Sequence, residues 1–271
     1  MLLAALVLFL LAAPIANPLR NVVFDGYQRL FPLERTTDPV AMVLIDEHAL
    51  ASYGQWPWPR TRMAELITRI SERAPASIAL DMVFPEPDRF SPASIADELP
   101  ILPDNLAAAL RSMPSNDLQF AAAIRGRNVV LGIAGGLPDP RFTKPPRAAP
   151  VVTKGERVAE LQLHGGHLGN VPVLDAAAAG RGLMNSGQQD QVVRVIPLIS
   201  RVQGEIVPAL SVEAFRVAID AGLRVDDGPM GLLTLGMAET STPMHEDGTT
   251  YVRMGHYDPG RPVSAYEVLS G

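Results

Sequence analysis

Hydrophobic residues in this chain gather in short continuous runs that alternate with amphipathic stretches. Val40–Ile45 is an unbroken apolar run that ends at Asp46, and Ile78–Phe84 is a second run interrupted only by Asp81. Runs of this length suit strands that are buried on both faces of a parallel sheet. The residues between the runs show one apolar helix face, formed by Met63, Leu66, Ile67, Ile70 and Ala74. The pattern predicts a strand–helix–strand crossover whose two strands are adjacent, parallel and central in the sheet.

A second crossover unit is predicted immediately downstream. One helix is expected up to Arg111, and a better marked one begins at a Ser115 or Asn116 N-cap and stops at Gly126. The apolar run Asn128–Ala134 then predicts a third buried strand.

The C-terminal half alternates short apolar runs with tight turns. Strands are predicted at residues 182–185, 192–199, 206–207, 232–235 and 249–254. Pro208 suits the first position of a helix that stops near Gly222, and Ser264 with Glu267 forms a capping box that opens a final helix. The fold class expected is α/β, with a mixed, largely parallel central sheet flanked by helices and antiparallel hairpins in the C-terminal half.

The segment from about residue 135 to 173 has no sustained pattern apart from a possible short strand at Arg157–Leu161. Long irregular segments often contact ligands. His164 and His167 lie here, three residues apart, and two such side chains could share a metal ion. No third ligand is evident in the sequence and the glycines between them suit a turn, so a turn is the favoured interpretation.

The first residues of the chain are strongly apolar. Met1–Leu19 contains no charged residue, and a helix of that length spans roughly 28 Å, close to the thickness of a bilayer core. A signal anchor is the favoured interpretation, ahead of a cleaved signal peptide or a buried soluble helix.

A juxtamembrane helix is expected over residues 20–36, followed by one domain over 37–271. Val23, Tyr27, Leu30 and Phe31 form an apolar stripe on this helix, which we expect to dock on the domain or on a partner protomer.

A stiff loop joins the first predicted strand to its helix. Pro57 and Pro59 fix their own φ angles and keep Trp56 and Trp58 out of the α region. Two interpretations of the tryptophans remain open: a hydrophobic plug over the sheet edge, which is favoured, and an aromatic wall that faces a ligand.

The motifs D-E-x-x-L, G-x-W-P-W-P-R and A-L-D-x-x-F-x-E-P-D resemble the type-two CHASE domain. The matching residues are Asp46, Glu47, Leu50, Gly54, Trp56, Pro57, Trp58, Pro59, Arg60, Asp81, Phe84, Glu86, Pro87 and Asp88. A second stretch is similar to the same family at Gly182, Asn185, Asp190, Val193, Arg194, Pro197, Leu198, Pro208, Leu210 and Ser211. It departs from the family at Gln188–Gln191, where a D-x-D-G turn is usual, which removes one carboxylate and a glycine.

The resemblance implies an extracytoplasmic sensor of a bacterial transmembrane receptor. The output domain would be a nucleotide cyclase, histidine kinase, diguanylate cyclase or Ser/Thr kinase, and the chain would be an N-terminal fragment of that receptor. The expected partners are the inner membrane, a second protomer and an unknown small molecule or envelope signal. The domain would face the periplasm.

The charge around the apolar segment disagrees with that orientation. Arg20, Arg29 and Arg35 follow the segment and no basic residue precedes it, which by the positive-inside rule favours a cytoplasmic domain. We follow the resemblance, and a basic segment upstream of Met1 would remove the conflict.

Composition excludes several function classes. The net charge is −6 with no long basic run, so the sequence carries no electrostatic footprint for nucleic acid. Cysteine is absent, which excludes disulfides, thiolate metal sites and cysteine nucleophiles. No cofactor is expected.

An enzymatic interpretation depends on acidic residues at the strand ends. Asp46 and Asp81, with Glu86 and Asp88 close behind, could hold a divalent cation or act as general acid and base. Carboxylates at such positions also commonly cap the next turn or helix, and no G-x-S-x-G, phosphate loop or H-E-x-x-H is present.

A sensor that is not itself an enzyme is therefore expected, with a periplasmic metal-dependent hydrolase as the alternative. The candidate ligand-contacting residues are Asp46, Glu47, Trp56, Trp58, Arg60, Asp81, Glu86 and Asp88.

Overall fold

The computed structural model describes residues 17–34, 37–147, 149–155, 160–189, 192–228, 232–255, 258 and 260–271. The chain forms two compact units. The N-terminal unit comprises Met1–Leu44 and Val252–Val263, and the main unit comprises Ile45–Tyr251 and Ser264–Gly271.

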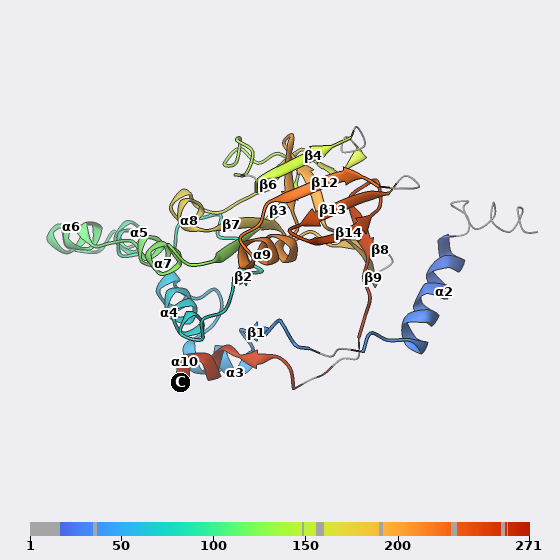
Figure 1. Ribbon diagram of the computed structural model, residues 1–271. Helices are drawn as coiled ribbons and strands as arrows, with labels where there is room; N and C mark the ends of the chain where they lie inside the picture. The colour runs from blue at the N-terminus through green and yellow to red at the C-terminus, as the bar shows by residue number, and fades with distance from the viewer. Residues whose placement is uncertain are drawn as a thin grey trace, which may run out of the picture. The chain divides into compact units, whose positions relative to one another are not determined.

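The centre of the main unit is a sheet built on β3 (Val129–Gly136), whose first five residues are all buried. β3 pairs in parallel with β2 (Ile78–Leu80) and with β7 (Gly180–Leu183) (Figure 1). Its last residues pair antiparallel with β6 (Gly166–Leu168). The central sheet is therefore mixed and largely parallel, which confirms the predicted fold class.

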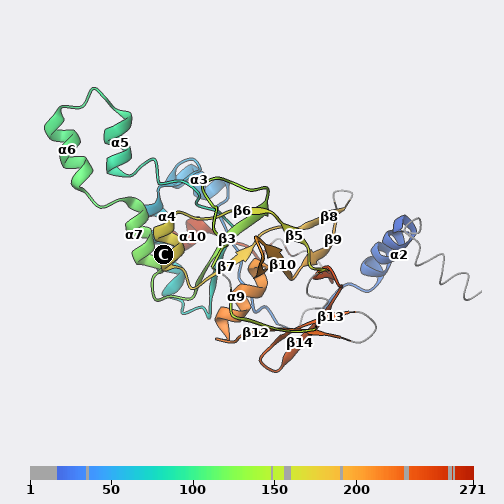
Figure 2. The same cartoon turned by 90° about the horizontal axis from the view of Figure 1, so that it is seen from above.

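The helices of the main unit pack against the sheet or against one another. They are α3 (Glu47–Tyr53), α4 (Arg60–Ser71), α5 (Pro92–Glu98), α6 (Asp104–Ser112), α7 (Asn116–Ile124), α8 (Pro172–Ala177), α9 (Leu210–Ala218) and α10 (Ala265–Ser270). α7 packs against α4 and α8, α9 packs against β3 and β7, and α10 packs against α3 and α4. α5 and α6 pack against each other and project away from the sheet in both views (Figures 1 and 2).

Shorter sheets make up the rest of the main unit. One has the order β14 (Thr240–Met244), β13 (Leu233–Met237), β12 (Leu223–Asp227), β4 (Val151–Lys154). A second has the order β11 (Glu205–Pro208), β10 (Ile199–Val202), β5 (Leu163–His164), and a third the order β15 (Thr249–Tyr251), β9 (Val192–Pro197), β8 (Gly187–Gln189). The antiparallel β12–β13–β14 meander and the β10–β11 hairpin confirm the predicted C-terminal hairpins.

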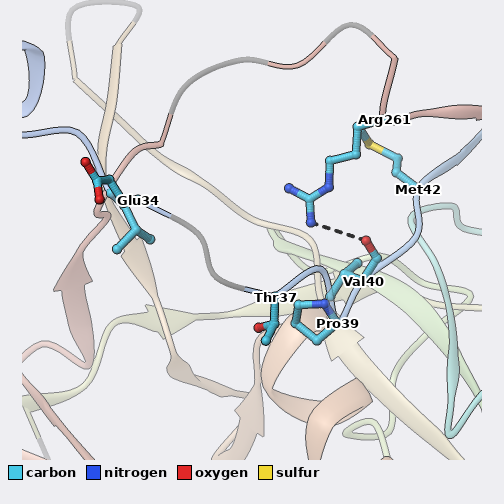
Figure 3. A pocket seen from close by; sticks show the side chains of 7 residues that line it. Glu34, Thr37, Pro39, Val40, Met42 and Arg261 are labelled. Atoms are coloured by element: carbon cyan, nitrogen blue, oxygen red, sulfur yellow. Dashed lines mark hydrogen bonds between the residues drawn. The ribbon is translucent and has the colours of Figure 1, made fainter.

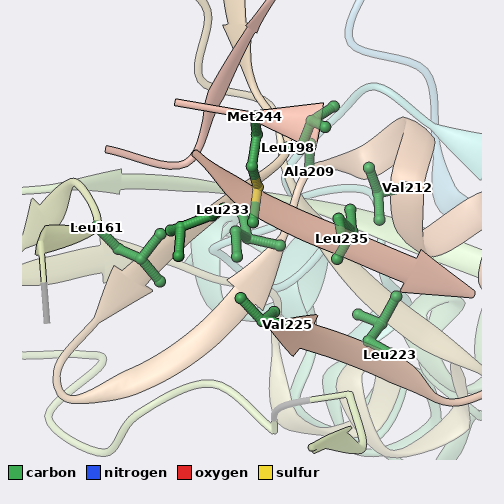
Figure 4. Close-up of a cluster of buried hydrophobic side chains, with 10 residues drawn as sticks. Leu161, Leu198, Ala209, Val212, Leu223, Val225, Leu233, Leu235 and Met244 are labelled. Atoms are coloured by element: carbon green, nitrogen blue, oxygen red, sulfur yellow. The ribbon is translucent and has the colours of Figure 1, made fainter. Parts of the chain in front are cut away.

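These strands enclose a hydrophobic core of their own. Its buried side chains are Leu161, Leu198, Ile199, Ala209, Val212, Leu223, Val225, Leu233, Leu235 and Met244, and they converge between the meander and α9 (Figure 4). Side chains from alternate positions of β12 and β13 point into this core, as the two-residue period of a strand requires.

The N-terminal unit contains α2 (Asn17–Leu30) and β1 (Val43–Leu44). β1 forms a two-stranded sheet with β16 (Val263–Ser264), and the Val263 N–H donates to the Met42 carbonyl at 2.8 Å. Leu33 forms an isolated parallel bridge with Gly255. This unit therefore joins residues from opposite ends of the chain.

Several local predictions are confirmed. α4, α6 and α7 lie where the sequence predicts helices, and the Ser115 side chain accepts the Leu118 N–H as the N-cap of α7. α4 and α6 begin instead after Pro59 and Pro103, which make no side-chain cap. Ser264 caps α10 by accepting the Tyr266 N–H at 3.1 Å. Helix capping is a local interaction, so the sequence alone is enough to specify it.

The predicted central crossover is wrong in its pairing. β1 does not pair with β2: β1 pairs with β16, and β2 pairs with β3. The run Val40–Ile45 supplies only two strand residues, because Asp46 already begins a helix, and Val40 is 65% exposed. The partner of β1 comes from the other end of the chain, which no local hydrophobic pattern specifies.

The start and end of α9 also differ from the prediction. Pro208 remains in β11 opposite Ile199, and the Ala209 N–H donates to the Leu198 carbonyl, so the strand pairing delays the helix until Leu210. The helix ends at Ala218, before Gly222.

Two predictions fall wholly or largely outside the described residues. Residues 1–16 of the predicted 1–19 anchor and residues 157–159 of the predicted strand at 157–161 are not described. Among the described helices, none combines the length and apolar character needed to cross a membrane. The predicted juxtamembrane helix over 20–36 corresponds to α2, which ends at Leu30, ahead of Pro32.

Gly182 is a point of close contact between β7 and α9. A Cβ added there would lie 2.7 Å from the Leu210 backbone nitrogen, whereas a Cβ at Gly136 in β3 would meet nothing within 4 Å. We expect Gly182→Ala to lower the free energy of unfolding by about 1–3 kcal/mol, as overpacking does. Urea denaturation measures this, with Gly136→Ala as the matched control. Equal losses in both variants would contradict the close contact.

Candidate functional site

Asp46 acts as a helix cap. One of its carboxylate oxygens accepts the Ala49 N–H at 2.9 Å and the Ser264 hydroxyl at 2.8 Å. The hydrogen bond from the Ala49 backbone, followed by the one from Ser264, lowers the pKa of Asp46. Since Ser264 is itself the N-cap of α10, this one carboxylate joins the starts of α3 and α10. The capping interpretation of Asp46 is confirmed.

The structure does not bring the predicted acidic residues together. Glu47 and Asp81 are exposed, the first in the first turn of α3 and the second directly after β2. Glu86 is exposed and pairs with Arg141 at 2.9 Å, while Asp88 is buried. Within the described residues no group of three or more His, Asp or Glu side chains could hold a metal ion.

The two tryptophans of the loop have different environments. Trp58 is 1% exposed, its indole N–H donates to the Gly54 carbonyl at 2.7 Å, and its ring contacts Tyr53 edge-on. Trp56 is 44% exposed and lies 6.5 Å from Trp58 between ring centroids. Trp58 is buried, as the plug interpretation expects of both tryptophans, whereas Trp56 lies at the surface.

Asp88 is the centre of a buried polar network. It is only 4% exposed, and one carboxylate oxygen accepts both the Arg60 backbone N–H and the Asn116 side-chain amide, each at 2.8 Å. The other oxygen accepts the Phe90 N–H at 3.0 Å. The Asp88 N–H in turn donates to Asp117 at 2.9 Å. Hydrogen bonds to a buried carboxylate offset the cost of removing its charge from water.

Arg60 supplies the positive charge of this network. Its Nε lies 3.4 Å from the Asp117 carboxylate, and its guanidinium carbon lies 4.4 Å from the centroid of the Phe84 ring. Nη2 also donates to the Glu86 carbonyl at 3.3 Å. Burial lowers the pKa of Arg60, and the nearby charges of Asp117 and Asp88 oppose that shift. Arg60 is therefore held against the loop after β2 by charge, by hydrogen bonding and by a cation–π contact.

Three members of the network were not among the predicted site residues. Asn116 and Asp117 were recognised only as the start of a helix, yet both are buried, and the Ser91 hydroxyl accepts the Asn116 N–H at 3.0 Å. The sequence hint of this role was the pair of polar residues directly after the Ser115 N-cap, because side chains in the first turn of a helix can reach a neighbouring segment. The network holds the start of α4, the loop after β2 and the start of α7 together.

A surface pocket of about 540 Å³ lies within the N-terminal unit (Figure 3). Its lining residues are Leu33, Glu34, Thr37, Pro39, Val40, Met42 and Arg261. The Arg261 guanidinium donates to the Val40 carbonyl at 3.3 Å and pairs with Asp38 at 3.1 Å. None of the eight predicted site residues lines this pocket, which depends on contact between segments far apart in the sequence.

The model of the CHASE2 domain matches residues 2–270. The chain belongs to the CHASE2 family. CHASE2 domains are extracytoplasmic sensory domains and are not catalytic. No curated protein and no solved structure matches the sequence significantly.

Of the two histidines considered as a metal pair in this CHASE2 chain, His167 is buried and His164 is partly buried. His167 is buried, with Nδ1 3.1 Å from the Gln203 side-chain oxygen and its ring against Phe142. The His164 ring packs on the backbone of Gly135, where an added Cβ would lie 2.7 Å from it. Burial lowers the pKa of both rings; for His167, Gln203, Asp175 and Asp139 oppose the shift.

The buried network should dominate the stability of the CHASE2 chain. We expect Arg60→Gln to cost roughly 3–5 kcal/mol in unfolding free energy, because it leaves two buried carboxylates without their cation. Arg62→Gln, two residues along α4, removes an exposed pair with Glu65 and should cost at most about 1 kcal/mol. Adding Asp117→Asn to Arg60→Gln should recover part of the loss. Chemical denaturation of the four proteins measures these differences, and equal costs for the two arginines would contradict the network's role.

The histidines make stability depend on pH. A pKa lowered from 6.5 in the folded state means that the unfolded state binds more protons below that pH, so stability falls as the pH drops below about 6.5. His167→Gln removes the titrating ring and should flatten this dependence between pH 7 and 5, leaving the part due to His164. Thermal melting across that pH range measures it, and an unchanged slope in the variant would exclude His167 as a source.

Proposed function

We propose that this CHASE2 chain is the extracytoplasmic input domain of a bacterial transmembrane signalling receptor. The observation that carries the proposal is the family match over residues 2–270. The output would be an adenylate or guanylate cyclase, or else a histidine kinase, diguanylate cyclase or Ser/Thr kinase, encoded outside this sequence. The chain itself would bind or respond and would catalyse nothing.

The proposed location is the inner membrane, with residues 37–271 facing the periplasm. The uncharged segment Met1–Leu19 supports an anchor, because its length as a helix approaches the thickness of a bilayer core. The extracytoplasmic character of the family supports the orientation.

The proposed response is a shift between two arrangements of a homodimer. Internal contacts of the main unit favour rigid-body movement: Asp46 joins α3 to α10 through Ser264, and the rings of His48 and Tyr266 stack at 3.9 Å between the same two helices. Helices coupled in this way move together, so a change at one is transmitted to the other. The signal would be a small molecule or a state of the envelope.

Among the residues that the structure describes, no cluster supports the alternative of a metal-dependent hydrolase. Asp46 caps a helix, Glu86 pairs with a surface arginine, and Asp88 is enclosed by hydrogen bonds. A divalent cation needs several oxygen ligands around one point, and these carboxylates serve separate local purposes.

Topology tests the proposal directly. We expect a reporter that is active only outside the cytoplasm, such as alkaline phosphatase fused after Gly271, to be active in bacteria that make the chain. A fluorescent protein that matures only in the cytoplasm, fused at the same residue, is the matched control and should stay dark. A bright cytoplasmic reporter with an inactive exported one would overturn the extracytoplasmic assignment.

A further inference from the structure

The short segment Leu163–Leu168, called the β5–β6 segment here, joins two sheets of the main unit (Figure 2). β5 carries His164 and pairs in parallel with β10. β6 carries His167 and pairs antiparallel with β3 of the central sheet. Gly165 is the single residue between the two strands, so the chain passes from one sheet to the other within a few residues.

Each histidine contacts the sheet to which the other one belongs. The His164 ring packs on Gly135 of β3, where an added Cβ would lie 2.7 Å from the ring. His167 reaches in the opposite direction, and its Nδ1 lies 3.1 Å from the side-chain oxygen of Gln203, the residue that follows β10. The two rings are therefore reciprocal contacts across the joint between the sheets.

The hydrogen bonds around His167 define where its ring would take up a proton. The Gln203 amide nitrogen donates to the Phe142 carbonyl at 3.2 Å, so the amide oxygen faces the ring and Nδ1 carries the hydrogen of that bond. An additional proton must enter at Nε2. A Cβ added to Gly169 would lie 3.1 Å from this Nε2 and 3.0 Å from Phe142 Cδ1. His167 is thus enclosed by the loop Leu137–Phe142, which Gln203 ties to the joint.

The carboxylates that act on His167 already have cationic partners. Burial lowers the pKa of His167, and the charges of Asp175 on α8 and Asp139 in the loop oppose that shift. Asp175 pairs with Arg181 at 2.7 Å, and Asp139 pairs with Arg141 at 2.9 Å. Neither carboxylate is therefore available to balance a His167 imidazolium alone.

His164 has uncharged neighbours at the joint. Its strand partner is Val202, and its buried Nε2 has no hydrogen-bond partner among the described residues. The charged residues of β10 and β11 are Arg201, in register with Leu163, and Glu205, in register with Val202. Burial lowers the pKa of His164. A charged ring at this place gains free energy by reaching water.

An apolar cluster joins the same two sheets without any titratable group. Ile133 of β3 and Leu183 of β7 pack with Val202 of β10 and Val207 of β11. Leu183 also forms a bridge with Ala209. Protons do not act on these side chains, so the cluster can hold the sheets together while the histidine contacts open. Openings of this local kind need less free energy than unfolding of the whole unit.

We propose that acid opens the main unit locally at the β5–β6 segment. Protonated His164 and His167 leave their contacts with Gly135 and Gln203, the loop Leu137–Phe142 separates from the segment, and the apolar cluster serves as the hinge. Histidines that gain charge between about pH 7 and pH 5 are a general basis of pH switches. The opening itself does not depend on a sensory role. That protons would be the stimulus of the sensor is the part that rests on the proposed function.

Hydrogen–deuterium exchange followed by mass spectrometry tests the opening in the full chain, purified in a mild detergent. Exchange is expressed as protection relative to the unfolded peptide at each pH, which removes the intrinsic pH dependence of the exchange reaction. We expect protection in residues 134–142 and 163–168 to fall several-fold between about pH 7 and pH 5. α4 and the β12–β13 pair should keep their protection. Unchanged protection in the first two segments, or equal loss in all four, would overturn the proposal.

Variants connect the opening to the two rings. His164→Gln combined with His167→Gln should remove the dependence on pH, whereas a general loosening by the substitutions would lower protection equally at both pH values. His245→Gln is the matched control, because His245 lies between β14 and β15, and it should respond as the unchanged chain does. A double variant that keeps the full pH response would overturn the proposal.

Nuclear magnetic resonance of the ring protons gives a second measurement that needs no substitution at the joint. The titration midpoints of His164 and His167 should coincide with the midpoint of the opening. Rings that titrate without any loss of protection would contradict the mechanism. A failed topology test would leave this local opening unaffected, so failure of the proposed function and failure of this inference are distinguishable.

Discussion

The interaction on which the main unit depends is the burial of two carboxylates beside one guanidinium. Asp88 and Asp117 are removed from solvent and share Arg60. Buried charges are costly unless each finds a cation or hydrogen-bond donors, so the elements that carry them cannot separate freely. These elements are the start of α4, the loop after β2 and the start of α7.

The motif that identifies the family has a structural role here. Trp58 fills the interior, Arg60 and Asp88 form the network, and Asp46 joins two helix starts. These motif residues hold the fold together, because each of them packs against or hydrogen-bonds to a specific partner.

The two units differ in how much of their apolar side-chain surface is exposed. The main unit buries its large apolar side chains in continuous cores, whereas the N-terminal unit leaves apolar residues of α2 and of the segment before β1 exposed, Val40 among them. It also contains the pocket beside Arg261. A unit that exposes apolar surface next to an uncharged N-terminal segment is suited to contact with lipid or another apolar partner.

The sequence by itself determined the family, the fold class and the elements that local interactions specify. Local patterns predicted the caps at Asp46, Ser115 and Ser264 and the apolar stripes of α4 and α7. Capping and amphipathicity can be predicted in this way because they involve residues only a few positions apart. Only the tertiary structure decided that β1 pairs with β16, that Asp88 and Asp117 share Arg60, and that Asp46, Glu86 and Asp88 have different partners. Those outcomes depend on contacts between distant segments, and a one-dimensional pattern of polarity records which residues are buried without recording what they are buried against.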